Sequence, residues 1–272
     1  MRTRGLPPEE FPHILAAHRA APEADVLKNG RRSTVTRVPS SQGQVCVKEY
    51  RVRGLVDMVK DRLRGSRARH AWQAAEALVA QGVSVPEPLG LAKRGRCGYF
   101  LTRHIEGAAT LKDLFSGRFA QAEAPQELGV KRRLLGQLGR WLRAVHDRGV
   151  YHDDWSPKNI LAREGPQGWR FYLLDMESAW PPRRLTRRRR AKNLAQVSDV
   201  PRGATATDKM RVLLAYAGRD ATLTRGLFPS HVQALARRRQ RQWEKVQKRA
   251  LKRKTRLRRK AKSGPGRKPH SR

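Results

Sequence analysis

Residues 151–159 read YHDDWSPKN and bring a histidine, two aspartates, a lysine and an asparagine into nine positions. Apolar residues at helical spacing precede this segment and two strand-like runs follow it, so the segment is predicted to be the turn between a helix and a hairpin. Such a turn can display polar side chains without filling a core. Taken alone, it is more often a capping cluster than a catalytic site, so its role depends on the rest of the chain.

Other parts of the chain supply matching groups in a defined order. Asp154 and Asn159 are five residues apart, and Asp175 follows the apolar run FYLL. Upstream, VCVK places Lys48 on a predicted strand. A carboxylate that orients a hydroxyl, followed by an asparagine and a second carboxylate that bind magnesium, is the order found in kinases. The sequence therefore predicts ATP and Mg²⁺ as cofactors, with Asp154 catalytic. Asn159 and Asp175 would bind the metal, and Lys48 the nucleotide phosphates.

The other polar residues of the turn are not assigned to the metal or the phosphates by this order alone. His152 is interpreted as a buried residue that braces the turn, since this position has that role in the kinase pattern. Lys158 is either a solvated lysine or a residue that acts near the phosphates, and the sequence leaves both open. Asp153 stands where protein kinases carry arginine, so regulation by a phosphorylated loop is not expected.

The nucleotide-binding strands lack the usual glycine-rich pattern. The segment LKNGRRSTV offers Lys28, Gly30 and Ser33 as groups that could hold phosphates through a side chain or turn amides. A helix glutamate is also expected to pair with Lys48. Glu76 is the candidate, with a solvated helix face as the alternative.

Periodicity predicts an α+β chain, with a small sheet and one helix followed by a mainly helical part. Together with the kinase order of the polar residues, this indicates a bilobal fold of the protein-kinase type. Residues 33–38 and 44–50 alternate as strands, and 66–81 have helical spacing that ends at Gly82. Residues 131–149 form a second predicted helix. Its apolar stripe comprises Leu134, Leu135, Leu138, Trp141, Leu142 and Val145.

These elements define five segments. Residues 1–26 are a loose lead-in with one short helix, 27–106 a nucleotide-binding sheet lobe and 107–229 a mainly helical lobe that carries the catalytic and acceptor groups. Residues 230–262 are a basic amphipathic helix, and 263–272 have the composition of a disordered tail.

The net charge of +37 predicts an anionic partner or surface. Of the 60 Lys and Arg residues, 18 lie within 237–272 beside one acidic residue, Glu244. A narrow apolar stripe in the basic helix comprises Val232, Leu235, Ala236, Trp243, Val246, Ala250 and Leu257. This helix is predicted to lie on anionic lipid, with packing on the domain as the alternative. Nucleic acid is a partner that is not favoured, because no base-reading motif occurs.

The two cysteines, Cys46 and Cys97, are far apart and suggest neither a disulfide framework nor a metal knuckle. Neither a signal peptide nor a membrane-spanning run is readable. We therefore expect a cytoplasmic protein, and we expect it to be monomeric.

Six segments resemble the bacterial lipopolysaccharide core kinases, the Kdo and heptose kinase (WaaP-like) group of the protein-kinase-like fold. They are VCVKEYR, SRARHAWQAAEALVAQGVSVPEPLGL, GYFLTRHIEG, LGRWLRAVHDRGVYHDDWSPKNIL, FYLLDMESA and RRRRAKNLAQV, within roughly residues 28–220. The resemblance implies ATP-dependent phosphorylation of a sugar hydroxyl on the inner core, with lipopolysaccharide or a lipid A-core precursor as acceptor. It also implies a peripheral location at the inner face of the inner membrane, where such a substrate is embedded.

Two alternatives remain open: a kinase of another acceptor, protein or small molecule, and a catalytically weak module that binds membrane or RNA. The chain departs from the kinase pattern at Met176 and Glu177, which replace Phe-Gly, and Glu177 is a further candidate metal ligand. Basic residues on the acceptor side are expected to be Lys60, Arg62, Arg64, Arg67, Arg69, Arg187 to Arg190 and Lys192.

Overall fold

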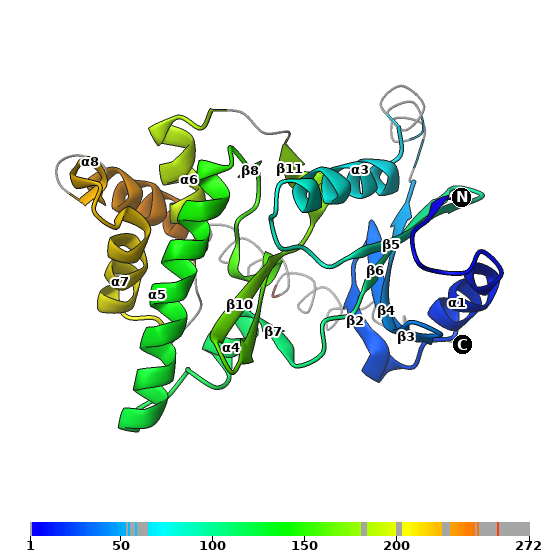
Figure 1. The fold of residues 1–272 in the computed structure, drawn as a ribbon, viewed down its shortest axis with the longest axis horizontal. Coiled ribbons are helices and arrows are strands. Elements are labelled where there is room, and N and C mark those ends of the chain that lie inside the picture. Colours follow the sequence, from blue (N-terminus) through cyan, green and yellow to red (C-terminus); the bar gives the residue numbers. More distant parts are fainter. Residues whose placement is uncertain are drawn as a thin grey trace, which may run out of the picture.

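The fold is that of a computed structural model, which describes residues 2–52, 54, 58, 65–180, 184–199, 203–224, 229–242, 244 and 255. Within these residues, a lobe built on an antiparallel sheet adjoins a mainly helical lobe (Figure 1). This arrangement confirms the predicted bilobal α+β fold.

The N-terminal lobe contains a six-stranded sheet among the described residues, in the order β1-β5-β6-β4-β3-β2. Every neighbouring pair is antiparallel. The strands are β1 (Arg2–Thr3), β2 (Val26–Asn29), β3 (Ser33–Ser40), β4 (Gly43–Arg51), β5 (Pro88–Arg94) and β6 (Cys97–Arg103). The predicted strands at 33–38 and 44–50 are thus the adjacent pair β3 and β4, and β4 carries Lys48.

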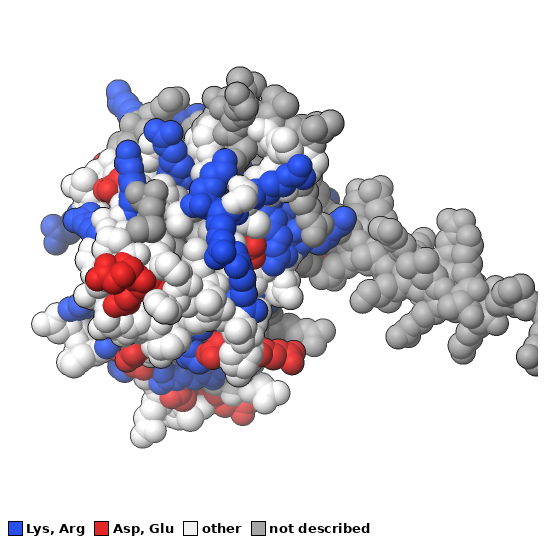
Figure 2. Space-filling view, turned by 90° about the vertical axis from the view of Figure 1, so that its right-hand side faces the viewer, with Lys and Arg blue, Asp and Glu red and all other residues white. Residues whose placement is uncertain are grey.

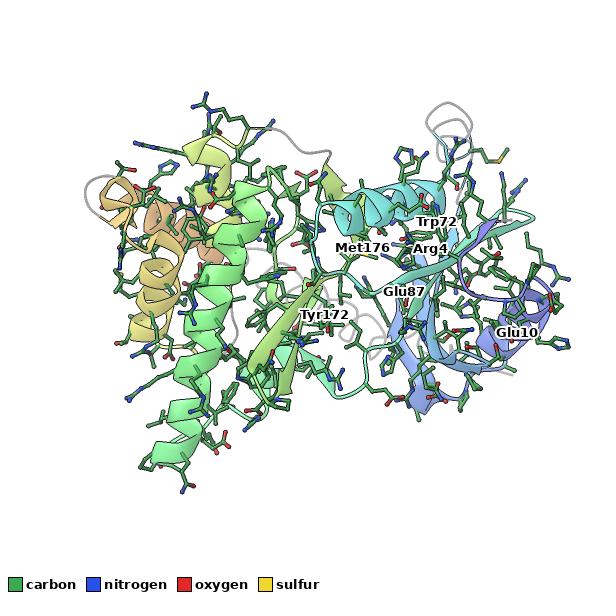
Figure 3. The ribbon with its side chains drawn as sticks, in the orientation of Figure 1. Arg4, Glu10, Trp72, Glu87, Tyr172 and Met176 are labelled. Atoms are coloured by element: carbon green, nitrogen blue, oxygen red, sulfur yellow. The ribbon has the colours of Figure 1, made fainter. Side chains whose placement is uncertain are left out.

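One helix, α3 (Arg67–Ala80), packs on this sheet as predicted. Ser66 begins it, because its hydroxyl accepts a hydrogen bond from the Arg69 amide at 3.2 Å. Gly82, with φ 67°, follows its end. Trp72 meets the ring of Phe100 on β6 edge to face, with centroids 6.4 Å apart (Figure 3).

The first 26 residues contain the short helix that their sequence predicts, but they are docked on the sheet rather than loose. Residues 2–3 pair with β5 at the sheet edge, and α1 (Glu10–Arg19) packs against the sheet. Phe11 is 2% exposed and lies on the bare backbone of Gly90, where a Cβ would meet the ring at 2.1 Å. A short 3₁₀ turn, η1 (Glu23–Asp25), then leads into β2. The glycine in β5 therefore makes the room that docks α1.

The C-terminal lobe is organised around the long helix α5 (Pro125–Asp147), whose predicted apolar stripe faces the core. Its other helices are α4 (Leu111–Ser116), α6 (Arg187–Val197), α7 (Ala206–Ala217), α8 (Ala221–Thr224) and a helical segment at 229–242. Small antiparallel sheets comprise β7 (Ala108–Thr110), β9 (Ile160–Gly165) and β10 (Gly168–Leu173), and β8 (Tyr151–His152) with β11 (Ala179–Trp180). The turns η2 (Pro157–Asn159) and η3 (Met176–Ser178) carry polar site residues.

The helical segment 229–242 packs on the C-terminal lobe. Val232 is 7% exposed, and Leu235 and Ala236 pack against the same core. Arg239 pairs with Asp199 after α6 at 2.8 Å. The apolar residues of the basic helix were expected either to lie on lipid or to pack on the domain. Those that the structure describes, Val232, Leu235 and Ala236, pack on the domain. The other members of the stripe, Trp243, Val246, Ala250 and Leu257, and the tail 263–272 lie outside the described residues.

A glycine lets α5 approach α7. A Cβ at Gly139 would meet the Val212 carbonyl oxygen at 2.4 Å and the Ala215 Cβ at 2.7 Å. One turn earlier on the same helix, a Cβ at Gly136 would meet only the end of the Arg140 side chain, at 3.7 Å. The two glycines therefore lie on the same helix, but only Gly139 is in close contact with α7.

We predict that Gly139→Ala lowers the free energy of unfolding by about 1–3 kcal/mol, because α7 must move away from α5. Gly136→Ala is the matched control, and it should raise the same quantity by about 0.5–1 kcal/mol through helix propensity. Urea unfolding of both variants measures these changes. Equal effects of the two substitutions would contradict the close approach at Gly139.

Candidate active site

A cavity of about 610 Å³ lies between the two lobes. Its N-lobe walls come from β2, β3, β4 and β6, and its C-lobe walls from the turns η2 and η3. Its lining residues include Lys28, Val35, Lys48, Tyr50, Phe100, Lys158, Asn159, Leu174, Asp175, Met176 and Glu177. The structure thus brings predicted groups more than a hundred residues apart to one place.

Lys48 crosses from β4 to the C-lobe. Its Nζ donates to both carboxylate oxygens of Glu177, at 3.0 and 2.9 Å, and also contacts an oxygen of Asp175. Its side chain is only 15% exposed. A buried ammonium needs such partners because desolvation penalises an unpaired charge. Lys48 therefore ties the sheet lobe to the turn that follows β10.

Glu177, not Glu76, is the glutamate that the structure places against Lys48. The Tyr50 hydroxyl donates to the Glu177 carboxylate at 2.7 Å, and Arg67 at the start of α3 lies 3.3 Å from it. Glu76 lies nine residues after Arg67 on α3, which places it half a turn away around the helix axis. No ion pair of Glu76 is found in the described part of the chain, so the expected pairing with Lys48 does not occur there.

Asp175 has an unusual backbone. It is the only residue other than glycine with a positive φ in the described chain, at φ 62° and ψ 46°. Aspartate tolerates this left-handed region better than most residues. Burial raises the pKa of its carboxyl group, but the charge and hydrogen bond of Lys48 outweigh burial and hold that pKa well below the ordinary value. The carboxylate is therefore ionised at neutral pH.

Asp154 and Asn159 face each other across the turn. The Asn159 amide nitrogen donates to the backbone carbonyl of Asp154 at 2.9 Å and to its carboxylate at 3.0 Å. Burial raises the pKa of Asp154, but neighbouring Ser156 and the charge of Lys158 bring it below the ordinary value. Asp154 remains an acceptor-only group at neutral pH, with its side chain 36% exposed.

His152 is fully buried behind these residues. Its Nδ1 accepts from the Asp154 amide at 3.1 Å, which leaves Nε2 to donate to the Asp175 carbonyl at 3.0 Å. Burial lowers the pKa of the imidazole, so the ring is neutral and bridges the two loops. This placement agrees with a bracing residue rather than an acid or base.

Two amide side chains on α6 hold the same turn, and sequence reasoning missed both. Asn193 donates to the His152 carbonyl at 2.9 Å, and Gln196 donates to the Asp153 carbonyl. Both are buried, at 0% and 3% exposed. The available signal was an amide pair three residues apart among the apolar positions of KNLAQV, because buried amides need fixed partners.

The remaining predicted residues are spread around the cavity. Lys28 lines it, whereas Gly30 and Ser33 close the β2–β3 turn, where the Gly30 amide donates to the Ser33 carbonyl at 3.0 Å. Neither of these two is among the described lining residues. Lys158 lies 3.2 Å from the Asp154 carboxylate with its side chain 57% exposed, so it is both solvated and beside the cavity.

The donor set fits a magnesium ion held mainly by its phosphate ligands. Asn159 uses its amide nitrogen on Asp154, which leaves its carbonyl oxygen as a hard ligand beside the Asp175 carboxylate. Within the described residues, no group of three or more His, Cys, Asp or Glu could hold a metal ion on its own. Magnesium suits such a site because it usually takes one or two carboxylates and completes its octahedron with phosphates and water.

Several basic residues expected on the acceptor side are engaged elsewhere. Arg190 bonds the Asp147 carboxylate at 2.8 Å within the C-lobe, and Lys192 donates to the Tyr151 hydroxyl at 2.7 Å. Arg67 is bound to Glu177. Three more, Lys60, Arg62 and Arg64, lie outside the described residues.

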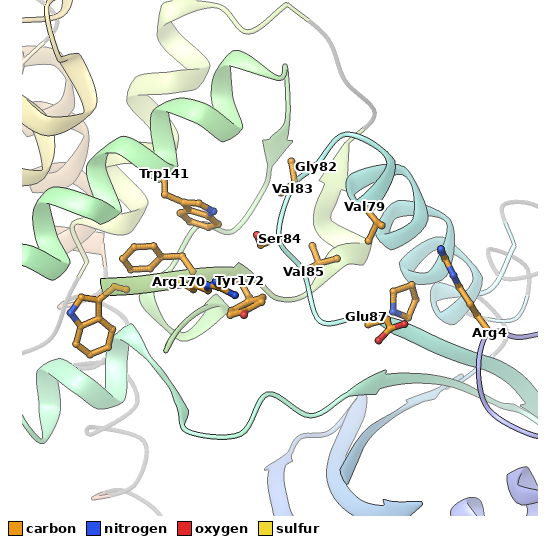
Figure 4. A pocket seen from close by; sticks show the side chains of 13 residues that line it. Arg4, Val79, Gly82, Val83, Ser84, Val85, Glu87, Trp141, Arg170 and Tyr172 are labelled. Carbon is orange, nitrogen blue, oxygen red and sulfur yellow. The ribbon is translucent and has the colours of Figure 1, made fainter. Parts of the chain in front are cut away.

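Another cavity, of about 770 Å³, borders the connection between α3 and β5 through Val83, Val85 and Glu87 (Figure 4). Trp141 on α5 and Tyr172 on β10 lie across from them. None of the predicted site residues is among its described lining residues. The candidate site is therefore the interlobe cavity that holds Lys48.

Comparison with known proteins agrees with this geometry. The model of the lipopolysaccharide kinase (Kdo/WaaP) family matches residues 18–216. The chain belongs to this family. The match includes every predicted site residue from Lys28 to Asp175 and confirms the resemblance read from the sequence.

Curated proteins similar to this chain are sugar kinases by name. A 3-deoxy-D-manno-octulosonic acid kinase of Haemophilus influenzae (strain PittEE) is 27% identical over 150 residues, which cover 48% of this chain and 58% of that protein. The corresponding kinase of Xylella fastidiosa (strain 9a5c) is 25% identical over 185 residues, 60% of this chain and 68% of that protein. The chain thus spans somewhat more than half the length of the Haemophilus relative.

A solved structure, that of WaaP in complex with acyl carrier protein, shares the fold. It is 22% identical, covers 86% of this chain and 99% of its own, and superposes with a TM-score of 0.56. Both molecules therefore have the protein-kinase-like fold.

We predict that Glu177→Gln lowers the free energy of unfolding by about 1.5–3 kcal/mol, because Lys48 and Arg67 lose a charged hydrogen-bond partner. Glu76→Gln removes an equal charge from α3 and should change this quantity by less than about 0.5 kcal/mol. Denaturant unfolding without added ligands compares the two. A larger loss in Glu76→Gln would contradict the assignment of Glu177.

Proposed function

We propose that the protein transfers the γ-phosphoryl group of ATP to a sugar hydroxyl, on the Kdo or heptose inner core of lipopolysaccharide. One observation carries this proposal: Lys48, Asn159 and Asp175 line a single interlobe cavity, and the Asp154 carboxylate accepts a hydrogen bond from Asn159. These four groups follow the order that phosphoryl transfer requires. The family membership of the chain supports the reaction class.

Lys48 and Lys28 act on the nucleotide side. Both line the cavity, where their charges stabilise the triphosphate. Magnesium, when bound by Asn159 and Asp175, supplies charge neutralisation of the phosphoryl oxygens. Glu177 positions Lys48 rather than contacting the reacting atoms, since both of its oxygens are engaged by that lysine.

Asp154 acts on the acceptor side. Its carboxylate accepts the hydrogen bond of the sugar hydroxyl and aligns that oxygen with the γ-phosphorus. The new bond joins the sugar oxygen to phosphorus while the bond to the β-phosphate oxygen breaks. The hydroxyl proton passes to Asp154 and then to solvent, and ADP leaves. Positioning and electrostatics provide most of the rate in such transfers.

The sugar acceptor is supported by the relatives named above, which are kinases of 3-deoxy-D-manno-octulosonic acid. On the N-lobe end of the molecule, basic side chains gather in the upper half of the view, whereas acidic side chains lie mostly in the lower half (Figure 2). Such a basic patch suits a polyanionic glycolipid. No helix among the described residues is long and apolar enough to cross a membrane. We propose peripheral contact with the inner membrane through the basic C-terminal segment.

We predict that Asp154→Asn lowers kcat by about 10²–10⁴-fold, because the amide cannot accept the hydroxyl proton. The variant keeps the size of the side chain, so its unfolding midpoint should stay within a few degrees of the original. Asp153→Asn is the matched control, since that neighbouring carboxylate points toward Lys192 at 3.8 Å rather than into the cavity.

Transfer of labelled phosphate from ATP to a Kdo-bearing glycolipid precursor, with and without magnesium, provides the measurement. Near-normal turnover of Asp154→Asn would overturn the assignment of Asp154. Transfer to none of a panel of core sugars would overturn the proposed acceptor class.

A further inference from the structure

A cavity of about 850 Å³ borders the opposite side of the catalytic turn from the nucleotide strands. Asp154 and Lys158 line it, and Lys112 and Lys158 line the interlobe cavity as well. The full lining comprises Lys112, Asp154, Ser156, Pro157, Lys158, Ser198, Asp199, Lys209, Gln233, Ala236, Arg237, Arg239 and Gln240. The proposed catalytic carboxylate thus stands where a second substrate in this space would meet the nucleotide.

One wall of this cavity comes from the helical segment 229–242, through Gln233, Ala236, Arg237 and Gln240. The wall is fixed in place, because Val232 is buried in the C-lobe core and Arg239 pairs with Asp199. The family match ends at residue 216. This part of the cavity is therefore built by residues that follow the family match.

The cavity has an excess of positive charge. Two of its cations are paired, Lys158 with Asp154 and Arg239 with Asp199. In the described part of the chain, no ion pair is found for the other three, Lys112 on α4, Lys209 on α7 and Arg237.

The acidic neighbours of these cations are used elsewhere. Asp208, beside Lys209, pairs with the buried Lys131 at 2.7 Å. Asp113, beside Lys112, accepts from the Thr110 hydroxyl at 2.6 Å within its own helix cap. The two carboxylates that line the cavity, Asp154 and Asp199, are already paired with Lys158 and Arg239. Three cations from three separate elements therefore converge on one space without a carboxylate paired to any of them in the described part of the chain.

We propose that Lys112, Lys209 and Arg237 form an anion subsite that binds a carboxylate or phosphate of the acceptor while its hydroxyl lies at Asp154. The inference rests on the proposed function and deepens it, because it makes an anionic acceptor the preferred substrate. Arginine suits this role since its planar guanidinium binds such anions through two parallel hydrogen bonds. A neutral sugar would leave the three charges unpaired in the occupied cavity.

The test compares Arg237→Ala with Arg238→Ala. Both positions are exposed on the same helical segment, but Arg238 is not among the described residues that line the cavity. The acceptor probes are a glycoside of 3-deoxy-D-manno-octulosonic acid and its methyl ester, each with and without a phosphate on the neighbouring sugar. The two modifications distinguish a carboxylate from a phosphate as the bound group.

We expect the original protein to prefer one charged form over its neutral counterpart by about tenfold in kcat/KM. Arg237→Ala should remove most of that preference, and Lys209→Ala with Arg237→Ala should abolish it. The KM for ATP should not change in these variants. Arg238→Ala should keep the full preference, whereas equal behaviour of Arg237→Ala and Arg238→Ala would overturn the subsite.

Binding of the same probes, measured by calorimetry with a non-hydrolysable ATP analogue, separates the two proposals. Charge-selective binding that depends on Arg237, without phosphate transfer, would support the subsite and overturn the proposed function. Phosphate transfer without charge selectivity would support the function and overturn the subsite.

Discussion

The ion pair between Lys48 and the turn after β10 is the constraint on which the site depends. Lys48 belongs to the sheet lobe, while its partners Asp175 and Glu177 belong to the helical lobe. Tyr50 and Arg67, also from the sheet lobe, bind the same Glu177 carboxylate. Partly buried charges of this kind hold their geometry because losing one partner leaves another charge unpaired. These contacts therefore fix the distance between the two lobes at the part of the cavity where the phosphates are expected to bind.

The catalytic turn is held by a separate, uncharged network. Its triplet carries Asp153 where protein kinases carry arginine, so the triplet itself offers no cation to a phosphorylated loop. Instead, His152 bridges the loops of Asp154 and Asp175, and Asn193 and Gln196 bind the turn carbonyls. Buried neutral hydrogen bonds do not depend on an added charge. In the described structure, the turn is thus held by hydrogen bonds between neutral groups.

The sequence predicts those features of the site that depend only on residues close together in the chain. The spacing of Asp154 and Asn159 and the strand around Lys48 follow from short-range pattern. The partner of Lys48 was predicted wrongly as Glu76, because the choice depends on how α3 turns against the η3 residues. The docking of α1 was missed for a similar reason, since Phe11 packs on a glycine 79 positions away. Long-range packing decided each of these outcomes.

The left-handed backbone of Asp175 limits what can replace it, independently of any chemistry. Most side chains would add about 1–2 kcal/mol of backbone strain at this position, whereas asparagine and glycine adopt it readily. Replacing Asp175 with alanine would remove the carboxylate and would also strain or shift the backbone. The contribution of the charge alone can therefore be isolated only with asparagine, and alanine scanning would overstate it.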